Sequence, residues 1–168
     1  QAFEAASQPK LDASVWNSLE KSAWVAEGSA NPQRVVYVFT DSECPYCHSL
    51  WQATQPYLKQ GKVQLRNIIV AVIAPSSAGR GAAILSARDP LAALRLHEQN
   101  FGHSPLKPIK HMNQPLAKKL VDNNDLMNRL AVFGTPAMVY RDHDGSMHIV
   151  RGLPGDDLLR KIFDASAP

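Results

Sequence analysis

The sequence predicts an α/β domain in which a strand–helix–strand unit is followed by a helical insertion and then by a β-hairpin. Two apolar runs, residues 35–40 and 63–73, are rich in β-branched residues, as strands buried in a sheet are. About sixty residues without a strand pattern, about 75–134, separate them from two short strands around the turn Asp142–Gly145. The length of 168 residues suits one domain, residues 1–168.

Composition excludes several classes of protein. The 18 basic and 15 acidic residues are interspersed, and no basic block with aromatic residues between argues for nucleic-acid binding. No apolar run approaches the length of a membrane span. The first residue is Gln1 rather than Met, so the chain either follows a removed signal peptide or marks the edge of a trimmed sequence.

The elements before the first cysteine are predicted from capping and periodicity. Residues 1–10 are small and polar, and we expect a frayed start. Asp12 is suited to cap a helix over about residues 13–27, which Gly28 would end. The apolar stripe of that helix would be Val15, Leu19, Ala23 and Ala26.

The strand 35–40 leads into a helix that begins at Pro45, a residue suited to the first helical position. Pro56 should break or kink that helix, since proline lacks an N–H. The run 63–73 then predicts a strand parallel to the first, which makes a right-handed βαβ unit.

The insertion is predicted to contain helices, with a Pro-rich connection at residues 104–108, and no strand. One short helix covers about residues 82–87, and a second begins after the cap Asp89. A third includes residues 116–121, and Asn124 or Asp125 restarts a further helix. After the hairpin, a terminal amphipathic helix is expected, capped by Asp156.

Both cysteines of the chain lie in the segment Cys44–Cys47, where the second helix begins. Unpaired N–H groups and the helix dipole favour an anion at that place, and the thiolate is the reactive form of cysteine. Two cysteines give no disulfide framework, so a C-x-x-C pair indicates redox or metal chemistry. Cys44 is expected to be the more exposed thiol, with Cys47 one turn deeper.

Two other interpretations of the C-x-x-C pair are available. It could be half of a structural zinc site, but a second cysteine pair and an ordered histidine pair are missing. The pattern Cys44–His48 also satisfies the C-x-x-C-H signature of haem attachment, although His48 is equally well a partly exposed helix residue. The remaining histidines have no metal-ligand spacing and are interpreted as surface or hydrogen-bonded residues: His97, His103, His111, His143 and His148.

A set of short segments indicates a known family. They are Val38–Asp41, Cys44–Cys47, Gly61–Arg66, Ala82–Leu85, Asp89–Pro90, Thr135–Ala137 and Gly152–Pro154. Together, over about residues 12–165, they resemble the catalytic domain of the DsbC/DsbG family of periplasmic thiol–disulfide isomerases. The Cys-Pro-Tyr-Cys motif places the chain nearer to the DsbG branch.

The resemblance implies a thioredoxin-like fold with a helical insertion between the active-site βαβ unit and the C-terminal β-hairpin. In that fold the Thr135–Pro136 bond is cis and lies beside the cysteines, where its backbone can pair with an extended substrate. Cys44 would attack a substrate disulfide and Cys47 would resolve the mixed disulfide. Thr135 and Pro136 would hold the substrate.

Four neighbouring residues bear on the redox poise. Pro45 and Tyr46 are expected to tune it. Glu43, directly before the nucleophile, should oppose thiolate formation. Val38 occupies the position where thioredoxin places a buried acid, so a proton relay from that position is unavailable.

The function implied is a periplasmic oxidoreductase that isomerises or reduces disulfides, with cysteine sulfenic acids as a further substrate. The alternatives are a DsbA-like oxidase, which the threonine before the cis-proline disfavours, and a holdase chaperone with secondary redox activity. Expected partners are cysteine-containing periplasmic proteins and a membrane reductase of the DsbD type, without nucleic acid, metal or cofactor. The family's N-terminal dimerisation domain has no counterpart here, so a homodimer is expected only if such a domain exists.

Overall fold

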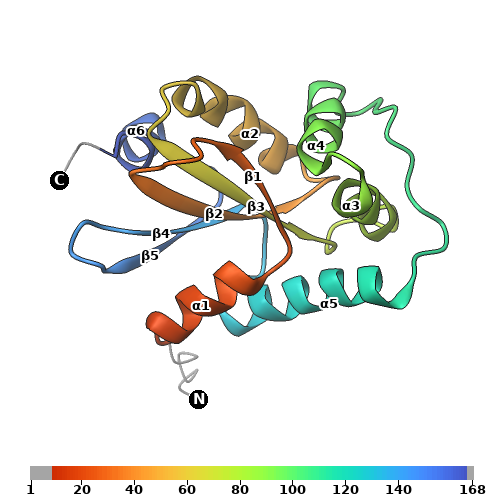
Figure 1. The fold of residues 1–168 in the computed structure, drawn as a ribbon, viewed down its shortest axis with the longest axis horizontal. Coiled ribbons are helices and arrows are strands. Elements are labelled where there is room, and N and C mark those ends of the chain that lie inside the picture. The colour runs from red at the N-terminus through yellow and green to blue at the C-terminus, as the bar shows by residue number, and fades with distance from the viewer. Residues whose placement is uncertain (1–8, 166–168) are drawn as a thin grey trace, which may run out of the picture.

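A five-stranded mixed sheet, with strands in the order β1-β3-β2-β4-β5, forms the centre of the molecule (Figure 1). The structure, a computed structural model, describes residues 9–165. The elements run in chain order α1 (Ala13–Lys21), β1 (Trp24–Gly28), β2 (Arg34–Asp41), α2 (Pro45–Leu58), β3 (Val63–Val70), α3 (Ser77–Ser86), α4 (Pro90–Gln99), α5 (Gln114–Arg129), β4 (Ala137–Arg141), β5 (Met147–Arg151) and α6 (Asp156–Phe163). Of the start predicted to fray, only Pro9 and Lys10 lie among the described residues.

The predicted βαβ unit is confirmed, since β2 and β3 pair in parallel and α2 connects them in the chain. The hairpin of β4 and β5 is confirmed as well, and β4 pairs antiparallel with β2. The register places Asp41 at the end of β2 beside Val70, and Ala137 at the start of β4 opposite Phe39. The segments that follow β2 and precede β4 therefore meet at one edge of the sheet.

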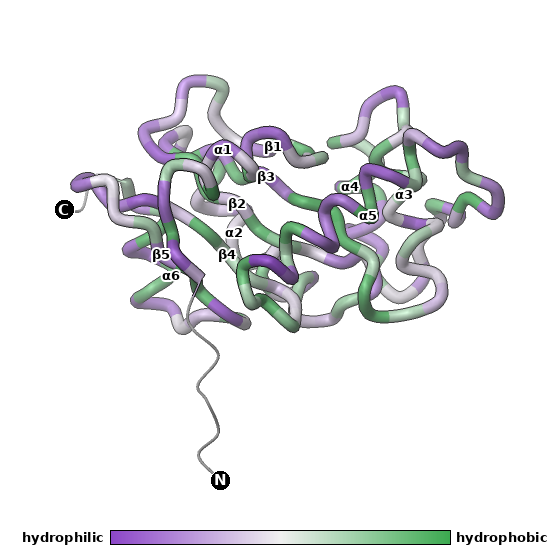
Figure 2. Tube along the Cα trace, turned by 90° about the horizontal axis from the view of Figure 1, so that it is seen from below, coloured by the Kyte–Doolittle hydropathy of each residue, from purple (hydrophilic) through white to green (hydrophobic). Residues whose placement is uncertain are grey.

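Side chains of β2 alternate between two apolar layers. Val36 and Val38 face α2 and α6, whereas Tyr37 and Phe39 face α1 and α5, and Figure 1 shows these helices on opposite sides of the sheet. In Figure 2, hydrophobic stretches run through the middle of the molecule, while hydrophilic stretches lie at its two ends and also along parts of the chain that cross the middle. No helix within the described residues combines the length and hydrophobicity that a membrane span needs.

The prediction of one helix over residues 13–27 is wrong. The helix ends at Lys21, and Trp24–Gly28 is an edge strand antiparallel to β3. Asn123 of α5 holds the connection, because its amide accepts from Ala23 N at 3.0 Å and donates to Ala23 O at 2.8 Å. These contacts and the pairing with β3 are tertiary, and they outweigh the helical stripe of the sequence.

Other predicted helix boundaries also differ from the structure, and α3 begins at Ser77 rather than at about residue 82. α2 continues through Pro56 to Leu58, so the helix does not break at this proline, and the alternative of a kink there stays a prediction. α5 is one helix over Gln114–Arg129 and does not restart at Asn124 or Asp125. The Asn124 side chain accepts from Ala71 N and donates to Ala71 O instead of capping a new helix. At α6 the N-cap is Gly155, and Asp156 is the first helical residue.

Candidate active site

Cys44 is the N-cap residue of α2, at the edge where β2 ends. Its Sγ accepts a hydrogen bond from Cys47 N at 3.3 Å. The Cys47 thiol, as a hydrogen-bond donor, lowers the pKa of Cys44 to about 6, and the Thr135 side chain and backbone N–H groups act in the same direction against burial. The thiolate predicted from the helix start therefore has specific donors around it.

Burial and the neighbouring Cys44 raise the pKa of the Cys47 thiol far above its usual range. The two cysteines thus differ strongly in acidity, as a nucleophile and a resolving thiol should. They do not differ in exposure: each is 3% exposed, so the expectation of a more exposed Cys44 is wrong. The reason is that the Thr135 carbonyl packs against Cys44 Sγ.

The Thr135–Pro136 peptide bond is cis, as the resemblance implied. The Cys44 thiol donates to Thr135 O at 3.6 Å, and Pro136 O accepts from Gly152 N at 2.8 Å. Thr135 Oγ1 is buried without a hydrogen-bond partner among the described residues, while its side chain lowers the pKa of both thiols. A hydroxyl donor is therefore available to the Cys44 thiolate.

Glu43 forms an ion pair with Arg80 of α3. Arg80 Nε also donates to Leu106 O at 3.0 Å in the segment between α4 and α5. The sequence singled out Glu43 but did not identify Arg80, because the partner comes from the insertion. The carboxylate that should oppose the thiolate is thus neutralised by a fixed guanidinium.

The turn before Cys44 is held by the Asp41 carboxylate, which is fully buried. Its Oδ1 accepts from Glu43 N at 2.9 Å and Ser77 Oγ at 2.8 Å. Its Oδ2 accepts from Val72 N at 2.7 Å and Ile73 N at 3.1 Å. Asp41 therefore ties β2, the loop after β3 and α3 together.

A cluster of buried polar residues that the sequence did not reveal lies behind α2. Glu27 of β1 is 1% exposed and Glu98 of α4 is 2% exposed. His48 Nδ1 and Glu98 Oε2 share a hydrogen bond of 2.8 Å, and His97 Nε2 lies 2.5 Å from Ser42 O. Over the residues that the structure describes, no group of three or more His, Cys, Asp or Glu side chains could hold a metal ion.

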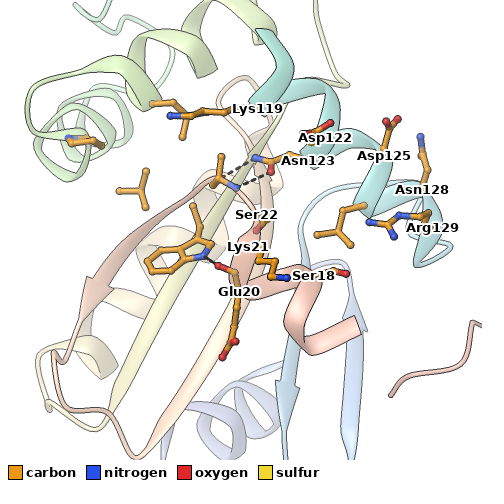
Figure 3. Close-up of a pocket in the computed structure, with 16 residues that line it drawn as sticks. Ser18, Glu20, Lys21, Ser22, Lys119, Asp122, Asn123, Asp125, Asn128 and Arg129 are labelled. Atoms are coloured by element: carbon orange, nitrogen blue, oxygen red, sulfur yellow. Dashed lines mark hydrogen bonds between the residues drawn. The ribbon is translucent and has the colours of Figure 1, made fainter. Parts of the chain in front are cut away.

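An open groove of about 1040 Å³ lies elsewhere, between the end of α1, the start of β1 and α5 (Figure 3). Its charged rim includes Lys21, Lys119, Asp122 and Arg129. The residues that line it include neither the cysteines nor Thr135. The groove is therefore separate from the dithiol.

The sequence profile of the thioredoxin-like domain family matches residues 22–167. The chain belongs to that family. The predicted thioredoxin-like fold with a helical insertion is thereby confirmed, and α3, α4 and α5 form the insertion.

Two curated relatives of this thioredoxin-like chain are named thiol:disulfide interchange protein DsbG. The one from Pseudomonas aeruginosa is 40% identical over 149 residues, and the one from Escherichia coli is 36% identical over 149 residues. The matches cover 89% of this chain but 58% and 60% of those proteins. The resemblance to the DsbC/DsbG family is confirmed, and the chain spans less than two thirds of the length of these relatives.

Solved structures show the same fold. Proteus mirabilis ScsC in a transitional conformation is 27% identical with a TM-score of 0.74, over 90% of this chain and 76% of that one. A periplasmic thioredoxin-like protein from Salmonella enterica serovar Typhimurium is 18% identical with a TM-score of 0.64, over 92% of this chain and 97% of that one. The second likeness shows the fold alone.

Proposed function

We propose that this chain is a thiol–disulfide oxidoreductase that reduces or isomerises disulfide bonds in other proteins. The observation that supports this most directly is that the pKa values of two neighbouring thiols shift in opposite directions, down for Cys44 at the helix start and up for Cys47 one turn further along. A dithiol of this kind performs exchange through a mixed disulfide. Its relatives named DsbG carry thiol:disulfide interchange in their names.

In the first step, the Cys44 thiolate attacks one sulfur of a substrate disulfide, and the other sulfur leaves as a thiolate. In the second step, Cys47 attacks Cys44 Sγ, and the substrate is released with both sulfurs reduced. If a substrate thiol attacks the mixed disulfide before Cys47 does, the substrate is released with a new pairing, which is isomerisation. A cysteine sulfenic acid would enter at the first step and lose its oxygen as water.

Exposed apolar side chains around Cys44 favour an unfolded polypeptide as substrate. Tyr46 is 67% exposed and Phe133 is 82% exposed. Val72 and Ile73 follow β3, and Leu153 follows β5, and all three are also exposed. The parallel pairing of β2 with β3 and the antiparallel pairing of β4 and β5 put these segments at the edge of the sheet that holds Cys44. We name these five side chains the apolar rim.

The position of Thr135 beside Cys44 supports the proposed role of Thr135 and Pro136 in holding the substrate. Proline has no N–H to compete with the substrate backbone, and an extended peptide can pair along such a segment. Pro45 and Tyr46, between the cysteines, are proposed to tune the redox poise. We place the protein in the periplasm, with a membrane reductase of the DsbD type keeping the dithiol reduced.

A Cys47→Ser variant tests the exchange, because it should stall at the mixed disulfide. Incubation with scrambled ribonuclease should give a covalent adduct that dithiothreitol releases, while Cys44→Ser should give none. The unaltered chain, kept reduced, should restore ribonuclease activity. An adduct with Cys44→Ser, or none with Cys47→Ser, would overturn the proposed function.

The same assay separates the alternatives. A DsbA-like oxidase would act faster on fully reduced ribonuclease than on the scrambled protein. A holdase would still suppress aggregation of an unfolded protein after Cys44→Ala, because this substitution leaves the apolar rim in place. For an isomerase, Cys44→Ala should abolish the activity.

A further inference from the structure

Cys47 and Glu98 line the same small cavity beneath the start of α2. The cavity has about 10 Å³ of room for the centre of a water molecule, which is space for one. Val38 of β2 also lines it, and the other lining residues are mostly apolar. Thioredoxin has a buried acid at the position of Val38, and this chain does not. The Glu98 carboxyl group of α4, in the insertion, lines the cavity instead.

His48 connects Glu98 to the surface. Its Nδ1 shares the 2.8 Å hydrogen bond with Glu98 Oε2, while 20% of the His48 side chain is exposed and 3% of the Glu98 side chain. The imidazole stacks on Phe101, with ring centroids 4.6 Å apart, which fixes its orientation. Burial lowers the pKa of His48 and so favours the neutral ring, in which one of the two nitrogens has no proton and can accept one.

The charges around Glu98 come from several elements. Burial raises the pKa of Glu98 to about 8, and negative charge on Glu27 of β1, on Cys44 and on Glu43 adds to the effect. Arg95, on the same helix as Glu98, lies 3.7 Å from Glu27 and compensates part of that charge.

Two further groups complete this surrounding. Arg80 pairs with Glu43, and the Nε2 of the neighbouring His97 lies 2.5 Å from Ser42 O. A carboxyl group whose pKa lies near neutral pH is suited to accept and return protons.

We propose that Glu98 takes the proton of the Cys47 thiol, through one water molecule in the shared cavity, as Cys47 attacks the mixed disulfide, and that His48 then passes this proton to solvent. The proposal rests on the proposed function, because it concerns the second step of that exchange. The Cys44–Cys47 bond forms as the bond from Cys44 to the substrate sulfur breaks. The substrate leaves as a thiolate and takes its proton from solvent.

The reaction with 5,5′-dithiobis(2-nitrobenzoic acid) separates the two steps, since each releases one coloured thiolate. Cys44 gives the first phase and Cys47 gives the second. For the unaltered chain, the rate of the second phase should rise with pH and level off above about 8, where Glu98 is ionised. In Glu98→Gln the second phase should be slowed at least about tenfold at pH 8. It should also climb with hydroxide concentration without levelling off, because Cys47 then loses its proton directly.

The matched control is Glu27→Gln, which alters a neighbouring buried acid that does not line the cavity. It should keep the plateau and move its onset to lower pH, because Glu27 raises the pKa of Glu98. Glu98→Asp keeps a carboxylate and should keep a plateau at a lower rate.

The outcomes are distinct for the two proposals. A second phase of Glu98→Gln with the rate and plateau of the unaltered chain would overturn the proton relay. If circular dichroism shows that Glu98→Gln is misfolded, Glu98→Asp decides, and a profile without a plateau overturns the relay. Absence of the first phase in the unaltered chain would instead overturn the proposed function.

Discussion

Arg80 of α3 pairs with Glu43, the residue directly before the proposed nucleophile Cys44. The sequence alone predicts that Glu43 opposes the thiolate. The structure shows that the insertion supplies the charge that compensates it, and Arg80 is held in place by its bond to Leu106 O. The charge of the residue next to Cys44 is therefore compensated by a helix that is remote in the sequence.

Arg80→Met should leave the Glu43 carboxylate uncompensated beside Cys44. The pKa of Cys44 is then expected to rise by about half a unit to one unit, because a nearby negative charge disfavours a thiolate. Thiolate absorbance in the ultraviolet, followed against pH, measures the change. The double variant Arg80→Met with Glu43→Gln is the control and should return the pKa towards that of the unaltered chain. An equal pKa in all three proteins would contradict the role given to Arg80.

The stability of the reduced protein should depend on Cys44. Its folded pKa of about 6 lies below the value of about 8.5 for an unfolded cysteine. The contribution to stability is therefore complete above about pH 8.5 and is lost as pH falls through 6. We compare the free energy of unfolding of the unaltered chain with that of Cys44→Ser at each pH. The advantage of the unaltered chain should be larger at pH 8 than at pH 5 by about 1–3 kcal/mol. Urea denaturation under reducing conditions measures it, and a pH-independent difference would refute the shift.

Asp41→Asn should destabilise the fold although the side chain keeps its size. The amide replaces an acceptor oxygen with a donor, so two of the four hydrogen bonds to Asp41 are lost in a buried place. We expect a loss of about 2–4 kcal/mol in the free energy of unfolding, measured in urea. Asp89→Asn is the matched control, because asparagine is an equally good N-cap for α4 and should change little. Equal losses in the two variants would argue against a stabilising role for the four hydrogen bonds to Asp41.

Gly28→Ala and Gly61→Ala separate a steric clash from backbone strain. Both glycines have positive φ, +93° and +77°, so both substitutions carry the strain of a left-handed residue. A Cβ on Gly28 would also lie 2.4 Å from Val63 O, whereas a Cβ on Gly61 would have nothing within 4 Å. We expect a cost of about 1 kcal/mol for Gly61→Ala and at least about 3 kcal/mol for Gly28→Ala, from thermal or urea denaturation. A Gly28→Ala protein as stable as Gly61→Ala would show that the backbone of β3 at Val63 can move to make room for the Cβ.

What the sequence predicted well is local. The strands β2 and β3 have dense apolar runs, and the proline after Cys44 marks a helix start. β1 was missed because Ala23 and Ala26 happen to continue the spacing of α1, and only the pairing with β3 decides between helix and strand.

The parts of the site that escaped the sequence come from the insertion. Arg80 is one basic residue among many, and nothing local connects it with Glu43. Glu98 did carry a signal, because Ala93, Leu94, His97 and Glu98 lie on one face of α4, and all four are buried. An acid on the apolar face of a predicted helix therefore indicates a buried carboxyl group.

The site is assembled from segments that are made at different times. Cys44 and Thr135 are 91 positions apart, and His48 and Glu98 are 50 positions apart. A chain that emerges from its N-terminus presents both thiols long before the residues that control them. Until then they are ordinary thiols with a pKa near about 8.5 and little thiolate at neutral pH. The low pKa of Cys44 is therefore acquired only when the fold is complete. A partly synthesised chain has little thiolate and reacts slowly with the disulfides of other proteins.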